Sequence, residues 1–276
     1  MPKAPPILSN KAFAAPSVFA PENLLREARR QKNLGDAAVP EICILDPDGD
    51  IWRALLAAGR TRPSPGWACY HTELREFAHA GEHFGIVRWA VGAPFAVLVA
   101  EQLFVSGCRL LLSMTSGGQI AQTAPPPYFV LIDRALRDEG TSYHYLPPAE
   151  YAVAEGGLAD AAMVACAARG LPIRRGASWT TDAPFRETAA AIEACRAGGI
   201  LAVEMEAAGL YAFAASRRRP VLCFAHVTNQ MAVTEGDFEK GGAAGSTAAL
   251  AVIAAAAGGW RRWTQAGAEA AGRTEG

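Results

Sequence analysis

The sequence predicts an α/β fold: a single three-layer α/β/α domain with a central, mixed, twisted sheet. Short apolar runs with the length of buried strands alternate with segments of helical periodicity. The runs at 41–45 and 200–204, EICIL and ILAVE, are apolar almost throughout, which is typical of strands covered on both faces. No break in composition inside residues 17–263 indicates a second domain, so we expect this range to form one domain.

The first half of the chain begins with a strand, an acidic turn and a helix, the usual opening of an α/β domain. A joint rich in proline and glycine at 61–66 separates this unit from the strands that follow. The pattern predicts a short helix at 24–31, a strand at 41–45, a turn at 46–50, a helix at 51–60, strands within 67–93, a helix at 95–106 and a strand at 108–114.

The second half continues the alternation and ends on an apolar helix. The pattern predicts a strand at 128–136, a loop at 138–148, a helix at 148–169, a strand at 171–179, a helix at 189–197, a strand at 200–204, a helix at 205–216, a strand at 220–228 and a closing helix at 246–263. Residues 1–16 are expected to form a disordered N-terminal tail, and 264–276 a loose polar tail.

Composition excludes several classes of partner. With a formal net charge of -1, the chain has no basic stripe for nucleic-acid phosphates, and the basic run at 217–219 is interpreted as a solvated turn. The six cysteines lack a CxxC pair, which favours reduced thiols in a cytoplasmic protein over disulfides or a metal site. No signal peptide is recognisable, and no stretch approaches the ~18 uncharged apolar residues of a membrane span. We therefore expect a cytoplasmic protein without a membrane or nucleic-acid partner.

Motifs for common nucleotide and hydrolase sites are absent. No GxGxxG follows the first strand, and GxxxxGK[ST], GxSxG and HExxH do not occur. The glycine-rich stretch at 241–245 follows no predicted strand and is interpreted as a flexible lead into the closing helix. We expect no cofactor.

Two glutamates, Glu204 and Glu206, interrupt the apolar stretch at 200–216. An ionised carboxylate removed from water costs several kcal/mol unless it is paired. Positions i and i+2 face the same side of an extended chain, so both carboxylates can meet one ligand at a strand end. Such a pair suits the vicinal hydroxyls of a sugar, or a positive charge that develops on it. The structural alternative is that Glu206 only complements the dipole of the following helix.

Further polar side chains follow predicted strands, at the edge where ligands of open α/β sheets bind. They are Asp46, Asp48, Asp50, Thr115, Ser116, Thr180, Thr181, Asp182, His226, Thr228 and Asn229. Together with the two glutamates they form a set of carboxylates, hydroxyls and an amide with almost no cation. Such a pocket fits a neutral polyhydroxyl ligand.

Several segments resemble one family in the right order along residues 17–263. The strongest is VEMEAAGLYAFA after a strand, with TTDAPFRET before it and AHVTN after it; the others are SVFAPENLL, LREF, VGAPFAVLVAEQL, TSGGQI and RDEGTSYHYLPP. In these segments the chain resembles the nucleoside phosphorylase family that includes uridine phosphorylase. The resemblance implies a single nucleoside phosphorylase-like domain, a homo-oligomer (dimer or hexamer) with sites at subunit interfaces, and cleavage of the N-glycosidic bond of a small-molecule nucleoside.

The resemblance also implies roles for individual residues. Glu206 and Met205 hold the ribose, with Glu206 accepting from the 2′- and 3′-hydroxyls, and Glu204 lines the same pocket. Thr115 faces phosphate, and Arg75 falls where the family lends an arginine to the phosphate of the neighbouring subunit. The other expected substrate-binding residues are Ser116, Gly117, Asp182, Phe185, Asn229 and Gln230, the last two beside the base.

The first turn departs from the family pattern, a GDPxR-like loop whose glycine amide and arginine bind phosphate. Here Leu45 takes the place of the glycine, and Gly49 or Asp50 that of the arginine. Leu112 replaces a second phosphate arginine. Because charge-assisted arginine contacts are the main stabilisation of a bound phosphate dianion, these changes disfavour phosphate as a ligand.

Three activities are consistent with the sequence. The favoured one is hydrolysis, with water as the acceptor and Asp50 or Asp48 as general base, since the hydrolytic branch of the superfamily carries a glutamate at the end of this turn. The second is phosphorolysis that relies on Arg75 and Thr115. The third is non-catalytic nucleoside binding. The sequence decides neither the base nor the 5′ substituent.

Overall fold

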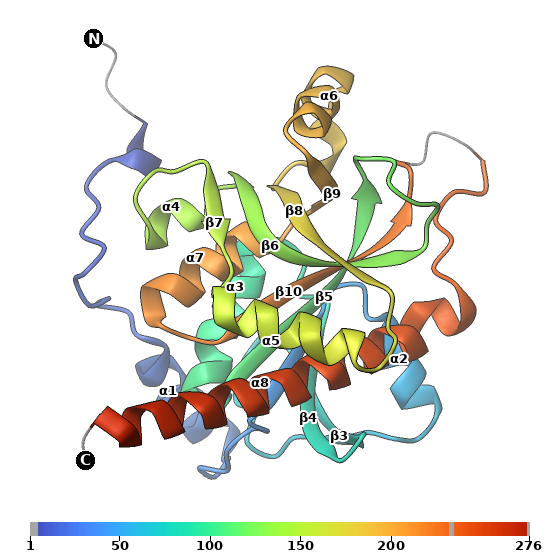
Figure 1. The fold of residues 1–276 in the computed structure, drawn as a ribbon. Coiled ribbons are helices and arrows are strands. Elements are labelled where there is room, and N and C mark those ends of the chain that lie inside the picture. Colours follow the sequence, from blue (N-terminus) through green and yellow to red (C-terminus); the bar gives the residue numbers. More distant parts are fainter. Residues whose placement is uncertain (1–4, 232–234, 275–276) are drawn as a thin grey trace.

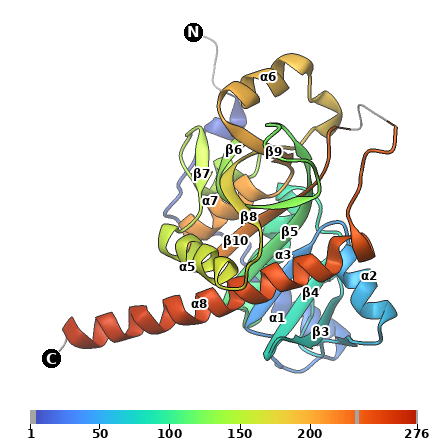
Figure 2. The ribbon, with the colours of Figure 1, turned by 45° about the vertical axis from the view of Figure 1, so that its right-hand side comes forward.

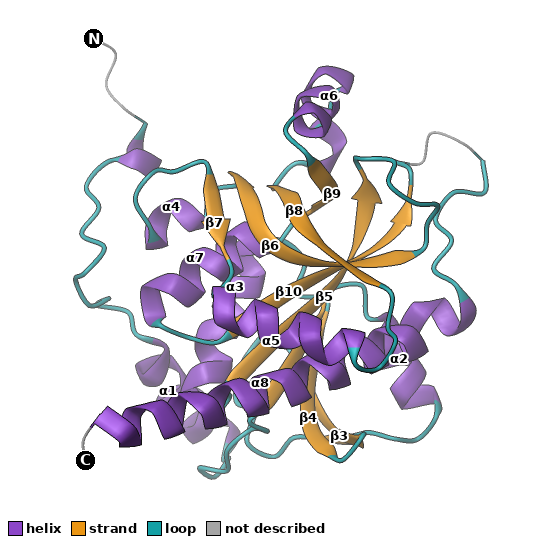
Figure 3. Ribbon diagram, viewed as in Figure 1, coloured by secondary structure: helices purple, strands orange, loops and turns teal. Residues whose placement is uncertain are grey.

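The computed structural model describes residues 5–231 and 235–274. Its centre is one mixed, twisted sheet with helices on both faces, which confirms the predicted α/β class (Figure 1, Figure 3). The strands are β1 (Ile42–Asp46), β2 (Arg62–Pro63), β3 (Leu74–His79), β4 (Glu82–Arg88), β5 (Leu110–Gln119), β6 (Tyr128–Asp138), β7 (Tyr151–Val153), β8 (Ile173–Thr181), β9 (Ile200–Glu204) and β10 (Val221–Asn229).

The helices follow the strands in the alternation that the sequence predicts. They are α1 (Pro21–Lys32), α2 (Asp50–Ala57), α3 (Ala93–Val105), α4 (Ser142–Tyr145), α5 (Gly156–Ala167), α6 (Ala189–Ala197), α7 (Ala207–Arg217) and α8 (Ser246–Thr274), with short 3-10 turns η1 (Pro6–Leu8), η2 (Pro184–Arg186) and η3 (Gly242–Gly245).

One end of the sheet closes on itself. Its strand order is β10-β6-β8-β9-β5-β1-β4-β3-β2, with β7 beside β6, and β10 pairs a second time with β5. The strands β5, β9, β8, β6 and β10 therefore form a small barrel, and β1, β4, β3 and β2 extend from it as an open sheet. Because β9 runs antiparallel to β5, with Gly118 opposite Val203, the end of β9 lies beside the end of β5.

Two hydrophobic cores cover the two faces of the sheet. Alternate residues of β5 belong to different cores: Leu111 lies in the core that includes Leu210 of α7, and Leu112 in the core that includes Ile253 of α8. Figure 2 shows α8 and α5 side by side on one face, and α3 and α7 lie together on the other. Because successive side chains of a strand point to opposite faces, this alternation determines which strand-end side chains point toward α7 and which toward α8.

Three segments differ from the predicted elements. The helix expected at 148–169 begins only at Gly156, because Tyr151–Val153 pairs with β6 as β7 and Glu155 caps α5 through the amides of Gly157 and Leu158. The loop expected at 138–148 contains the short helix α4. The closing helix continues past 263 to Thr274, since the alanine-rich segment expected as a loose tail has high helix propensity.

Helix α8 also corrects the expectation that no segment is long and apolar enough to cross a membrane. The stretch Gly242–Glu269, which comprises η3 and most of α8, has the length and composition of a membrane-spanning helix. Of the apolar window, 61% is buried inside the protein, and Val252, Ile253 and Trp260 belong to the core beneath the sheet. We conclude that α8 is the core helix of this fold.

Tyr211 provides a test of how α7 is attached to the barrel. Its ring is fully buried, its hydroxyl donates to the Ile132 carbonyl, and the Cys223 amide donates to that hydroxyl at 2.9 Å. Tyr211→Phe leaves both backbone groups buried without this partner, so urea denaturation should show a loss of about 1–3 kcal/mol in the free energy of unfolding.

The matched control for this change is Tyr70→Phe, because the Tyr70 hydroxyl contacts only the exposed Gln31 side chain. That variant should stay within about 0.5 kcal/mol of the parent. Equal stability of both variants would contradict the bridging role of Tyr211.

Candidate functional site

The candidate site lies at the edge of the sheet where β1, β4 and β5 end and the β9–α7 connection begins. Glu204 ends β9, and Glu206 is the residue that precedes the first turn of α7. Thr180 of β8 pairs with Glu204, and the β5–β9 register brings the TSGG segment alongside. The predicted meeting of these strand ends is thus a consequence of the barrel closure.

The carboxylate of Glu204 is turned into this connection and is fully occupied. It accepts hydrogen bonds from the Ser178 and Thr180 hydroxyls at 2.9 and 2.5 Å, and from the amides of Glu206 and Ala207 at 2.8 and 2.7 Å. Burial raises the pKa of Glu204, and these donors oppose the rise. Glu204 therefore holds the turn, and its oxygens are not free for a ligand.

Glu206, by contrast, keeps one oxygen available. Its Oε1 accepts from the Gly92 amide at 2.7 Å, whereas Oε2 is buried and has no hydrogen-bond partner in the part of the chain that the structure describes. Burial raises the pKa of Glu206 to about 8, the charge of Glu204 adds to the rise, and the Gly92 amide and the polar Thr115 side chain oppose it. A buried acceptor without a partner is costly, so this oxygen is suited to a hydroxyl donor from a ligand.

The acidic turn brings two aspartates to the same edge. Asp48 Oδ2 accepts from the Ser116 amide at 2.7 Å and also from the Ser116 hydroxyl. Asp50 begins α2 and pairs with both Arg53 and Lys240. The turn is thereby bound to the end of β5 on one side and to the segment before α8 on the other.

Asp46, the last residue of β1, is a third carboxylate of this cluster. It is buried and accepts from the Trp52 amide at 2.8 Å. Burial raises the pKa of Asp46 to about 7, and the charges of Asp48 and Asp50 add to the rise, although the Trp52 amide opposes it. Sequence analysis gave Asp46 only as a strand-end polar residue, because its burial is not visible in the sequence.

The acidic cluster encloses a cavity of only about 20 Å³. A single water needs roughly 10–15 Å³ of such volume, so the cavity accommodates one water and not a phosphate group. Its walls are Asp46, Asp48, Asp50, Ile51, Met114, Thr115, Ser116, His226, Ala244, Gly245, Ser246 and Ala249.

Lys240 and His226 close the cluster from the side of α8; the sequence predicts His226 only as a strand-end polar residue and does not single out Lys240. Lys240 lies 3.9 Å from Asp48 in addition to its pairing with Asp50. His226 stacks on Phe129 with ring centroids 4.4 Å apart. Burial, and then the charge of Lys240, lowers the pKa of His226 to about 4, so the ring is neutral at pH 7.

The glycine-rich stretch explains how the chain passes so close to His226. Gly245 has φ +74, and a Cβ there would lie 2.2 Å from Cε1 of His226. Only glycine fits this position without displacing the ring. The stretch at 241–245 is therefore a packing feature in front of α8, in agreement with its interpretation as a lead into that helix.

Asn229 pairs with Gly118 of β5, Gly117 precedes that residue on the same strand, and Met205 separates the two glutamates in the sequence. The Asn229 amide donates to the Thr228 hydroxyl at 3.2 Å, and its Oδ1 accepts from the Met231 amide. Met205 is half-buried between the two glutamates. A Cβ on Gly117 would lie 3.0 Å from the Val203 carbonyl, so its backbone packs directly on β9.

Four other predicted residues lie away from this cluster. Arg75 is on β3, and its guanidinium donates to the Thr61 hydroxyl at 2.8 Å. Asp182 is exposed and accepts from the Gly140 amide at 2.8 Å. Phe185 is 100% exposed. Gln230 lines a separate cavity of about 490 Å³ beside α6.

The protonation of Glu206 makes the stability of the protein depend on pH. A carboxyl whose pKa is 4.5 in the unfolded chain and about 8 in the folded one stabilises the fold fully below pH 4.5, and this contribution is lost as pH rises toward 8. In Glu206→Gln that loss is absent. The difference in unfolding free energy between parent and variant should therefore change by up to about 1.4 kcal/mol per pH unit across this window in urea titrations. Parallel pH profiles of the two proteins would contradict it.

Comparison with known proteins places the fold in context. The model of the phosphorylase superfamily matches residues 54–258. A purine nucleoside phosphorylase of DeoD type from Myxococcus xanthus is 28% identical over 137 residues, which are 49% of this chain and 57% of that protein. The chain thus matches little more than half the length of this curated relative.

Two solved structures share the fold. Purine nucleoside phosphorylase from Toxoplasma gondii, in complex with immucillin-H, has a TM-score of 0.69 at 15% sequence identity. The match covers 83% of this chain and 94% of the Toxoplasma chain. Uridine phosphorylase from Vibrio fischeri, complexed with 6-hydroxy-1-naphthoic acid, has a TM-score of 0.65 at 17% identity and covers 82% and 91%. Because the family model matches well over half of the sequence, the chain belongs to the phosphorylase superfamily.

Proposed function

We propose that this protein hydrolyses the N-glycosidic bond of a nucleoside or a related N-riboside, with water as the acceptor. The observation that carries the proposal is the contact between Asp48 and Ser116. One carboxylate oxygen of Asp48 accepts from both the amide and the hydroxyl of Ser116. These are the donors at the strand end where the family resemblance expects phosphate, so the chain's own carboxylate occupies an anion position.

The surrounding charges support the same acceptor. A phosphate dianion at Ser116 would have to displace Asp48 and would lie beside Asp46 and Asp50. The cations of this cluster, Lys240 and Arg53, are both engaged by Asp50. Repulsion between neighbouring like charges is strong in a buried site, where water screens it little. The water-sized cavity at this position agrees with a neutral nucleophile.

Glu206 supplies the sugar side of the proposed site. Its unpartnered Oε2 accepts from ribose hydroxyls, and its carboxylate becomes the negative group nearest the ring. Cleavage of an N-glycosidic bond develops positive charge on the sugar, as in other glycosidic cleavages with an oxocarbenium-like transition state. Above its pKa of about 8, Glu206 is an ionised carboxylate that is fixed before the reaction, and it stabilises this charge without reorganisation.

Of the two aspartates expected as general base, the contacts favour Asp48. Asp50 is paired with two cations, Arg53 and Lys240, so its carboxylate is already engaged. Asp48 Oδ1 accepts no hydrogen bond from the residues that the structure describes, so it is available to a water. In the proposed reaction the water oxygen bonds to C1′, the bond from C1′ to the base nitrogen breaks, the proton from the water passes to Asp48, and the departing base takes up a proton from solvent.

We further propose that the protein acts as a homo-oligomer. Arg75 is bound to Thr61 on β3, away from Glu206, so a role in substrate binding would require a neighbouring subunit. Phosphorolysis is the alternative activity, since the relative from Myxococcus xanthus is named as a purine nucleoside phosphorylase. It requires that phosphate displaces Asp48 from Ser116.

The acceptor is tested by measuring base release from a nucleoside panel with and without phosphate. We expect equal rates in both conditions. Asp48→Asn should slow release by about two to four orders of magnitude, the usual effect of a lost general base. Asp36→Asn, at an exposed loop position, is the matched control and should keep the parent rate. Acceleration by phosphate, with accumulation of pentose 1-phosphate, would establish phosphorolysis instead.

The role of Glu206 is tested with the isosteric change to glutamine. Glu206→Gln keeps the contact with the Gly92 amide and should fold normally, yet turnover should fall about a hundredfold, equivalent to ~3 kcal/mol of transition-state stabilisation. A variant within about threefold of the parent on its best substrate would mean that Glu206 has a structural role only.

A further inference from the structure

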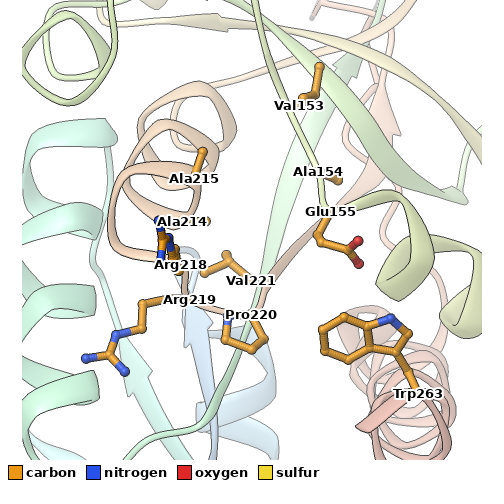
Figure 4. Close-up of a pocket in the computed structure, with 10 residues that line it drawn as sticks. All are labelled: Val153, Ala154, Glu155, Ala214, Ala215, Arg218, Arg219, Pro220, Val221 and Trp263. Carbon is orange, nitrogen blue, oxygen red and sulfur yellow. The ribbon is translucent and has the colours of Figure 1, made fainter. Parts of the chain in front are cut away.

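We propose that a second cavity, at the opposite end of α7 from Glu206, binds a small organic anion with a flat apolar body. The cavity has a volume of about 440 Å³ and lies between the end of α7, the start of β10, the β7–α5 connection and α8 (Figure 4). Glu206 precedes the first residue of α7, whereas Arg218 caps its last turn. Since α7 has 11 residues, the two sites are about 16 Å apart along the helix axis.

The walls of this distal cavity are mostly carbon. Val153 is 59% exposed at its mouth, and the indole of Trp263 faces Pro220 and Val221 across it in Figure 4. Ligand sites in proteins typically have volumes of roughly 300–1,000 Å³ and apolar walls with a few convergent polar groups. The cavity fits this description, and the indole and proline rings present flat surfaces to a planar guest.

The polar groups at its rim are cationic. Arg218 and Arg219 both line the cavity, and neither forms an ion pair within the described residues. The preceding Arg217, in contrast, pairs with Glu101 at 3.2 Å. Arg219 lies over the Phe104 ring at 5.4 Å from its centroid, which orients the guanidinium without neutralising it. In Figure 4 the Arg219 guanidinium points away from Pro220 and Trp263, so it contributes positive charge to the rim, and a rim with two unpaired arginines beside an apolar wall suits a carboxylate or a sulfonate.

One acid also lines the cavity, but its carboxylate is engaged elsewhere. Glu155 accepts from the amides of Gly157 and Leu158 at the start of α5. There the helix dipole offsets its charge. The rim therefore keeps a positive balance, and the basic run at 217–219 is more than a solvated turn, since its last two members form the charged side of a cavity.

A smaller neighbouring cavity extends the distal one. It has a volume of about 190 Å³ and shares Arg219, Pro220 and Trp263 with its neighbour. Trp260 and Phe104 add two further aromatic walls, and Arg109 adds a third guanidinium, already paired with Glu41. The combined space accommodates a ligand of two or three fused or linked rings.

The proposal is tested with 1-anilinonaphthalene-8-sulfonate, whose fluorescence rises in apolar surroundings. Titration of the folded protein should show one saturable site. The double variant Arg218→Gln/Arg219→Gln should weaken binding about tenfold or more, since the positive charge at the rim is lost. Ala215→Trp, an exposed position that fills the cavity, should abolish binding. Arg217→Gln, which changes the adjacent arginine outside the cavity, should bind like the parent.

A neutral naphthalene alcohol provides the second readout, because it has the apolar body without the charge. It should compete with the probe more weakly than naphthoate does. Absence of saturable binding, unchanged binding in Ala215→Trp, or equal competition by the alcohol and the acid would each overturn the proposal. Base release is not involved in these measurements, so their outcome is independent of the activity at Glu206.

Discussion

The arrangement of the candidate site depends on the buried carboxylate of Glu204. Two hydroxyls from β8 and two amides of the β9–α7 turn surround it. These donors replace the water that an ionised carboxylate loses on burial, which is the condition for keeping such a group inside a protein. The turn is thereby fixed, and Glu206 two residues later is held with one oxygen bound to Gly92 and the other free. Glu204 fixes the turn, and in the proposed function Glu206 meets the ligand.

Barrel closure extends this constraint to the acidic turn. β5 pairs with β9, β1 and β10, so its end is the common neighbour of the glutamates, of Asp48 and of His226. Asp48 satisfies the Ser116 donors that would otherwise attract an anion. Membership of the phosphorylase superfamily fixes the fold, whereas in the proposed function this local contact selects the acceptor.

Much of this could be predicted from the sequence because it rests on local pattern. The apolar runs around Glu204 predict β9 and α7. The polar residues that follow predicted strands include Thr115, Ser116 and Asp48, and the structure brings Asp48 and Ser116 into contact. Lys240 could not be found in this way, since it meets Asp50 across 190 positions of sequence and lies on no regular element. The sequence also could not predict which glutamate is fully hydrogen-bonded, because that depends on which hydroxyls of β8 face β9.

The central claim is that Asp48 stands where an anionic acceptor would otherwise bind, so that water attacks the sugar. The most direct measurement is phosphorus NMR of a complete reaction in oxygen-18 water at saturating phosphate, combined with mass spectrometry of the sugar product. The account predicts free pentose that carries the label at C1 and no new phosphate ester signal. Unlabelled pentose 1-phosphate as the product would contradict it.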